Sequence, residues 1–126
     1  MKQMRFFICD HCKNLIGVIH DAKVPMMCCG QKMTELVPGT VDASLEKHVP
    51  VVTVDGNIIT VSVGSVTHPM TEEHLIEWVY LQTNRGGQRK NLTAGSAPVV
   101  TFAVTDETPV AVYAYCNLHG LWKQDV

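Results

Sequence analysis

The sequence predicts an all-β protein in which a small metal-binding module precedes an antiparallel β-sandwich. Four of the five cysteines lie before residue 30, and from residue 49 onward short segments alternate apolar and polar residues between turn residues. No helical pattern of convincing length interrupts them. Several short strands joined by turns are typical of a sandwich.

The composition argues against nucleic-acid binding, a membrane span and secretion. The chain has 126 residues, 46% of them hydrophobic, and a net charge of -2. The longest basic run is Arg89-Lys90, so no nucleic-acid footprint is visible. No apolar run approaches the roughly 18 residues of a membrane span, and the start lacks a secretory signal. We expect a cytoplasmic protein with no nucleic-acid or membrane partner, whose cysteines bind metal rather than form disulfides.

The N-terminal module is predicted from its cysteines. A C-x-x-C pair follows the apolar run Phe6–Ile8, and a second, adjacent pair precedes the turn residue Gly30. Leu15–Ile19 between them is predicted to be a strand. A segment this short buries little core and usually needs a metal to fold. The four predicted ligands of this first metal are Cys9, Cys12, Cys28 and Cys29.

The cysteines alone leave the metal open, because four thiolates suit zinc and iron equally. A structural zinc ribbon is the simplest alternative. Against it, the side chains of Cys28 and Cys29 point apart in extended backbone, so they share an ion only through a distorted turn. His11 and His20 belong to neither pair and are expected to be solvated.

The loop Pro38-Gly39-Thr40 marks the expected domain boundary, which gives domains of residues 1–37 and 38–126. In the second domain, His74–Gln82 is compatible with a short helix, but its alternating β-branched and aromatic residues favour a strand. Turns are expected at 55–57 and 85–87. The predicted strands are 49–54, 59–63, 74–82, 99–104 and 110–115.

A second metal site is predicted from the histidines beside these strands. Loops held by rigid strands are suitable places for ligands. Four imidazoles and a thiolate exceed the tetrahedral preference of zinc and favour a redox metal. Bound to ferrous iron they leave a net charge of +1 and an open sixth position, which suits a small anion. The five candidates are His48, His68, His74, Cys116 and His119.

Together these motifs resemble the desulfoferrodoxins, two-iron superoxide reductases, over essentially the whole chain. The resemblance is carried by the two cysteine pairs, Glu46-Lys47-His48-Val49-Pro50, His68-Pro69-Met70 with His74, and Cys116-Asn117-Leu118-His119-Gly120. It implies a desulforedoxin-like, rubredoxin-type module followed by an immunoglobulin-like catalytic sandwich.

The resemblance also implies two non-haem irons per chain, one held by four cysteines and the other by four histidines and one cysteine. The four histidines would be equatorial ligands and Cys116 the axial one. Superoxide would be reduced by one electron to hydrogen peroxide, in a role in electron transport and detoxification of oxidative stress. An external donor such as rubredoxin would restore the ferrous state, and the protein would be a homodimer.

Two charged residues beside His48 have expected catalytic roles. Lys47 would attract the anion and help to deliver a proton, an effect that weakens with salt. Glu46 would, as the resemblance implies, cap the oxidised site after product leaves. Each is alternatively an ordinary surface residue. Backbone N–H groups of Leu118 and His119 are expected to restrain electron donation by the Cys116 thiolate.

The residues are compatible with three other functions. An electron carrier would use the first iron alone and would need neither an open position nor Lys47. A zinc-stabilised binding module would leave the four histidines unexplained. A dismutase must oxidise superoxide as readily as it reduces it, whereas a thiolate ligand favours a net reductant.

Overall fold

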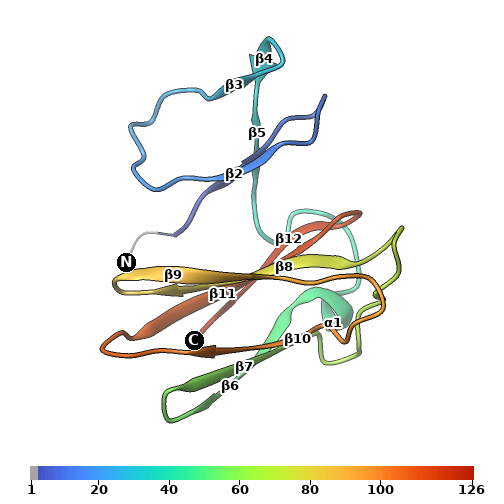
Figure 1. The fold of residues 1–126 in the computed structure, drawn as a ribbon. Helices are drawn as coiled ribbons and strands as arrows, with labels where there is room; N and C mark the ends of the chain where they lie inside the picture. Colours follow the sequence, from blue (N-terminus) through green and yellow to red (C-terminus); the bar gives the residue numbers. More distant parts are fainter. Residues whose placement is uncertain (1–2) are drawn as a thin grey trace. The chain divides into compact units, whose positions relative to one another are not determined.

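The structure is a computed structural model that describes residues 3–126, and its chain divides into two compact units, Met1–Val37 and Pro38–Val126 (Figure 1). In the described part, strands predominate, and the one helix is the four-residue α1 (Leu45–His48). All strand pairs are antiparallel, so the predicted all-β class is confirmed. Within residues 3–126, no helix is long and apolar enough to cross a membrane.

The first unit consists of a small sheet and a hairpin. The sheet has the order β2-β1-β5, and β3 pairs with β4. Phe6, Phe7 and Cys9 are the buried residues on and beside β1. Its strands are β1 (Phe6–Ile8), β2 (Leu15–Gly17), β3 (Met27–Cys28), β4 (Gln31–Lys32) and β5 (Thr34–Leu36).

Arg5 ties three segments of this unit together. Its guanidinium donates two hydrogen bonds to Glu35, of 2.9 and 3.0 Å, and one of 2.6 Å to Asp21. A guanidinium that faces one carboxylate with two N–H groups has the geometry in which surface ion pairs are most effective. The loop after β2 is thereby fixed to the sheet.

The second unit has a three-stranded sheet of order β10-β7-β6 and a four-stranded sheet of order β12-β11-β8-β9. A hydrophobic core gathers residues from both, as a two-sheet sandwich requires. The strands are β6 (Pro50–Asp55), β7 (Ile58–Val63), β8 (Ile76–Thr83), β9 (Gly86–Asn91), β10 (Val99–Ala103), β11 (Pro109–Cys116) and β12 (Gly120–Asp125).

The core follows the predicted alternation on β7, where Ile59, Val61 and Val63 are at most 1% exposed. On β8, alternation is incomplete because Val79 and Leu81 are also fully buried. That strand is central in its sheet, paired with both β11 and β9, and carries buried side chains on both of its faces.

Several elements were not predicted. β9 contains no apolar residue and pairs only with β8, and a polar edge strand has no periodicity to detect. The turn predicted over 85–87 spans Asn84–Arg85, so Gly86 already belongs to β9. β12 and the short helix α1 were also missed, and each carries or adjoins a predicted ligand. The strand predicted over 15–19 ends at Gly17.

Candidate metal centres

The four cysteines of the first unit converge as predicted, with sulfurs all within 4.8 Å of one another. Cys12 Sγ lies 3.6 Å from Cys28 Sγ, which lies 4.0 Å from Cys29 Sγ. The adjacent pair shares this space because Cys29 has a φ of 52° and Gly30 a φ of 74°. The left-handed turn at these two residues is the distortion that an ion shared by neighbouring cysteines demands. His11 and His20 are exposed and lie outside the group.

Backbone N–H groups aim at these sulfurs. The N–H of Cys12 donates to Cys9 Sγ, and that of Asn14 to Cys12 Sγ, both at 3.5 Å. The N–H of Cys12 is the largest cause that lowers the pKa of Cys9 to about 6. The neighbouring Cys12 sulfur instead raises the pKa of Cys29 to about 12. Four crowded sulfurs cannot all ionise without a cation among them, so this group fits a metal.

The second group draws its five side chains from four places in the second unit. His48 ends α1, His68 and His74 lie on the connection between β7 and β8, Cys116 ends β11, and His119 lies in the turn before β12. The donor atoms of the first four lie within 4.8 Å of one another. His119 Nδ1 joins them, 3.1 Å from His48 Nε2 and 3.9 Å from Cys116 Sγ.

The four imidazoles form a closed square. Neighbouring rings are nearly perpendicular, with interplanar angles between 77° and 88°. His48 and His74 lie on opposite sides, 6.5 Å apart and inclined by only 30°. The centroid separations around the square are 4.6 Å for His48–His68, 4.7 Å for His68–His74, 5.1 Å for His74–His119 and 4.9 Å for His119–His48.

Backbone carbonyls fix the proton on two of these rings. His48 Nδ1 donates to the carbonyl of Ser44 at 2.6 Å, and His68 Nδ1 donates to that of Pro69 at 2.7 Å. In the neutral rings each Nε2 therefore carries a lone pair. Those two lone pairs face one another across 3.1 Å. Two acceptors so close repel each other unless a cation lies between them.

The spacing matches a metal ion. Four nitrogens about 2.1 Å from one ion, with right angles between neighbours, lie about 3.0 Å apart. The observed contacts of His48 with His68 and with His119 are both 3.1 Å. His74 Nε2 is buried and is, within residues 3–126, the one buried side-chain polar atom without a hydrogen-bond partner. A metal supplies the partner that this nitrogen lacks.

Burial favours the neutral form of three of the histidines, His48, His68 and His74. It lowers the pKa of His68 to about 4 and is also the largest cause that lowers the pKa values of His48 and His74. Neutral imidazole is the form that binds metals, so protons compete weakly at neutral pH.

Cys116 has no exposed surface, and burial raises the pKa of its thiol. The N–H groups of Leu118 and His119 act in the opposite direction by hydrogen bonding to the sulfur, at the two positions that the sequence indicated. A bound cation favours the thiolate further. Two N–H donors then withdraw charge from that thiolate.

Glu46 and Lys47 both lie on the exposed side of α1. The Lys47 charge contributes to the lowered pKa values of His48 and His74, although less than burial does. The lysine thus acts electrostatically on two rings of the square. The Glu46 carbonyl accepts a hydrogen bond from Val66 N–H, which anchors the helix.

Sequence reasoning missed two residues of this site. Trp122 packs its ring 5.0 Å from that of His48 and donates from Nε1 to the His119 carbonyl at 3.0 Å. Asn117 hydrogen-bonds to the segment that carries His74. Nothing in the sequence pointed to Trp122, because β12 itself was not predicted. Asn117 could have been found from its place between the predicted ligands Cys116 and His119.

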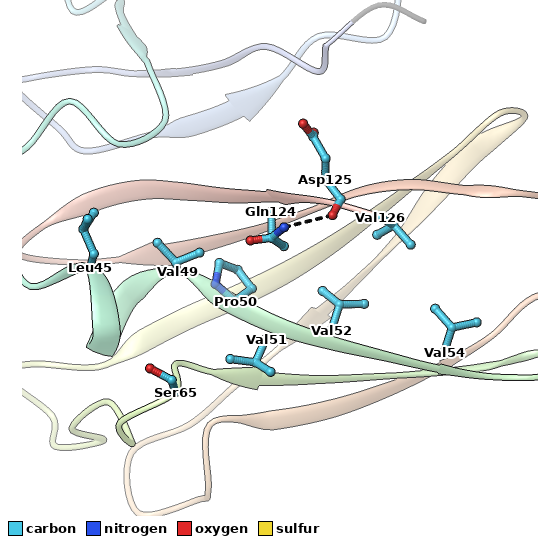
Figure 2. Close-up of a pocket in the computed structure, with 10 residues that line it drawn as sticks. All are labelled: Leu45, Val49, Pro50, Val51, Val52, Val54, Ser65, Gln124, Asp125 and Val126. Atoms are coloured by element: carbon cyan, nitrogen blue, oxygen red, sulfur yellow. Dashed lines mark hydrogen bonds between the residues drawn. The ribbon is translucent and has the colours of Figure 1, made fainter.

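An apolar groove of about 540 Å³ lies apart from these donors (Figure 2). It runs along β6 to the end of β12 and contains none of the predicted ligands. Its exposed apolar side chains include Leu45, Val51 and Val54. The lining residues are Leu45, Val49, Pro50, Val51, Val52, Val54, Ser65, Gln124, Asp125 and Val126.

The fold and the two donor groups define a two-centre metalloprotein, with one sulfur site and one mixed nitrogen and sulfur site. Residues 40–125 match the sequence model of the family described as Desulfoferrodoxin. A desulfoferrodoxin of Syntrophotalea carbinolica is 40% identical, with 98% of each chain covered. The chain belongs to the desulfoferrodoxin family, and its two iron centres are thereby confirmed.

Solved structures of superoxide reductases are similar to this chain. The superoxide reductase from Treponema pallidum is similar with a TM-score of 0.83 and 43% identity, covering 98% of this chain and 100% of that one. The one-iron superoxide reductase from Giardia intestinalis is similar with a TM-score of 0.56 and 34% identity. That match covers 64% of this chain and 97% of the other.

Proposed function

We propose that the chain is a superoxide reductase, which adds one electron and two protons to superoxide to form hydrogen peroxide. The observation that carries the proposal is the convergence of four imidazoles and one buried sulfur on one point. Ferrous iron bound there supplies the electron. The similarity to structures named superoxide reductase supports the same activity.

The ligands we propose for this iron are Cys116 and the imidazoles of His48, His68, His74 and His119. His119 would bind through Nδ1 and the other three through Nε2, because those atoms face the centre. Cys9, Cys12, Cys28 and Cys29 would hold the other iron in residues 1–37, a desulforedoxin-like domain, while residues 38–126 form the catalytic domain.

Lys47 and Glu46 would act beside the ligands. The ammonium of Lys47, whose charge already acts on His48 and His74, would attract superoxide and place a proton donor at the site. The carboxylate of Glu46, one residue earlier on α1, would close the site after product leaves. Buried Cys116 with its two N–H donors would tune the electron-donating power of the metal.

The reaction needs an external electron donor, for which we propose rubredoxin or a similar carrier in the cytoplasm. Cys12 and Cys29 are exposed, which would let such a donor approach the first iron. We also propose a homodimer. The exposed apolar side chains along β6, at 42% for Val51 and 51% for Val54, offer a surface for it.

The test is anaerobic purification of wild type and Cys116→Ser, with metal analysis and visible spectra before and after addition of superoxide. We expect about two irons per wild-type chain and a ferric thiolate band that disappears in the variant, while the bands of the four-cysteine iron persist. Peroxide should form without oxygen. Zinc at both sites, or a spectrum indifferent to Cys116, would refute the proposal, and evolution of oxygen would indicate a dismutase.

A further inference from the structure

His74 lies on the long connection between β7 and β8, which also carries His68. This connection follows Val63, where β7 ends, and precedes Ile76, where β8 begins. His48 and His68 have their rings oriented directly, because a backbone carbonyl accepts from Nδ1 of each. For His74 the hydrogen bonds involve the backbone instead. Its N–H donates to Thr71 Oγ1 at 3.1 Å, and its carbonyl accepts from Thr71 N–H at 2.9 Å.

The contacts between Thr71 and His74 close a local turn, but they do not connect this turn to the segments that carry the other ligands. Asn117 makes that connection across the sequence. Its Oδ1 accepts from Leu75 N–H at 3.0 Å, and its Nδ2 donates to the Glu73 carbonyl at 2.9 Å. A third bond of 3.3 Å runs from the Asn117 N–H to the Leu75 carbonyl. One side chain thus holds both neighbours of His74.

Asn117 also immediately follows Cys116 and precedes His119 by two residues, so it belongs to the turn that carries two other donors. An amide that bonds to two backbone groups simultaneously fixes both position and orientation. His74 Nε2 has no hydrogen-bond partner among the described residues 3–126, so its orientation depends on the backbone that carries it.

We propose that Asn117 is a positioning residue, whose side-chain amide sets the place of the His74 imidazole relative to Cys116 and His119. This inference rests on the proposed iron site. Loss of the Asn117 amide leaves all five ligands present, but the His74 imidazole is no longer held in position relative to the other three. Groups that orient metal ligands typically contribute ten- to a hundredfold to metal affinity.

The protein contains a matched control far from the metal. Asn84, in the turn after β8, also bonds to the backbone of a loop residue, with one bond from its side chain and one from its own backbone. Its Oδ1 accepts from Thr108 N–H at 2.8 Å, and its own N–H donates to the Thr108 carbonyl at 3.0 Å. Asn84→Ala therefore removes one side-chain hydrogen bond to a loop backbone, keeps the bond from the N–H of residue 84, and touches no ligand segment.

The experiment measures ferrous iron affinity of the full-length protein by chelator competition, with the two irons counted separately by Mössbauer spectroscopy. The variants are Asn117→Ala, Asn84→Ala, His74→Ala and the double variant Asn117→Ala/His74→Ala. Asn117→Ala is expected to lower affinity at the histidine site by about ten- to a hundredfold, and Asn84→Ala to leave it unchanged. If Asn117 acts through His74, the double variant binds iron no more weakly than His74→Ala alone.

Equal affinities for Asn117→Ala and Asn84→Ala, or additive losses in the double variant, would overturn the proposal. Asn117→Asp serves if the alanine variant does not fold, since it keeps the acceptor for Leu75 and removes the donor to Glu73. For Asn117→Asp we expect a smaller loss of iron affinity than for Asn117→Ala, because the added negative charge attracts the metal. An affinity equal to that of wild type would contradict the proposal. Superoxide reduction is assayed separately, so wild-type iron binding without reductase activity would refute the proposed function and leave this test intact.

Discussion

At the scale of single residues, the site is defined by where protons are held. Ser44 and Pro69 supply carbonyls that keep the proton of His48 and of His68 on Nδ1. The opposite nitrogens are thereby committed to the metal before it binds. The Nε2 lone pairs of His48 and His68 face one another across 3.1 Å. They repel each other in the metal-free protein, and a bound cation stabilises them.

Lys47→Ala is predicted to lower the second-order rate constant for superoxide by about tenfold and to weaken its dependence on ionic strength, because a guiding charge is lost. Stopped-flow measurements at several salt concentrations test this. Arg85→Ala removes an equal charge at the other end of β8 and should change neither quantity. Equal effects of the two substitutions would mean that Lys47 contributes only to the net charge.

The ion pairs of Arg5 predict a dependence on pH. The guanidinium lowers the pKa of Glu35, and it also holds the pKa of Asp21 below its usual range. Carboxylates with lowered pKa values stabilise the fold fully above their ordinary pKa, near 4, and lose that contribution as the pH falls through the folded value.

Arg5→Ala should therefore release the four-cysteine iron more readily than wild type at pH 6, and the difference should shrink toward pH 2. Thermal loss of that iron's visible absorption at several pH values measures it. A difference between the two proteins that does not change with pH would contradict the assignment to these carboxylates.

At the scale of elements, the short helix α1 is held against the end of β7. A Cβ added to Gly64 would lie 2.6 Å from the Glu46 carbonyl oxygen and 3.0 Å from that of Val49. These atoms belong to the backbone of α1 and of the residue after it, so no side chain can move away to relieve the contact. The close approach of Gly64 thus determines where His48 stands.

Gly64→Ala is predicted to displace α1, to cost about 1–3 kcal/mol of stability and to weaken iron binding at the histidine site. Gly39→Ala is the comparison. Gly39 has open space around it but a φ of 71°, so alanine there should cost roughly 1–2 kcal/mol through backbone strain. Urea unfolding and chelator competition should show both variants destabilised, with only Gly64→Ala losing iron affinity.

At the scale of the whole molecule, each metal site is complete within one unit. All four cysteines of the first group lie in Met1–Val37, and all five donors of the second lie in Pro38–Val126. Neither donor set borrows a residue from the other unit. The second site therefore does not require the first unit for its ligands.

Cys12→Ser is predicted to reduce iron content from about two per chain to about one, while pre-reduced protein keeps its rate constant for superoxide. Metal analysis and pulse radiolysis of the same preparation test the two halves of this prediction. A large loss of rate would show that the first site supports catalysis directly.

The chemistry of this protein could be predicted from its residues alone. Donor identities, the division into sulfur and nitrogen sites and the alternation along β7 are local properties, visible as residue types and spacings. The strain at Cys28-Cys29 was visible in the same way, and it appears in the structure as a left-handed turn at Cys29.

Which atoms meet depends on the tertiary structure. His48 and His119 are 71 positions apart, and no local pattern reveals that Nε2 of one faces Nδ1 of the other. The polar edge strand β9, the packing of Trp122 against His48 and the hydrogen bonds of Asn117 to the neighbours of His74 depend likewise on contacts between distant segments. Such contacts follow from how strands pair and pack, which leaves little trace in the residues of any single segment.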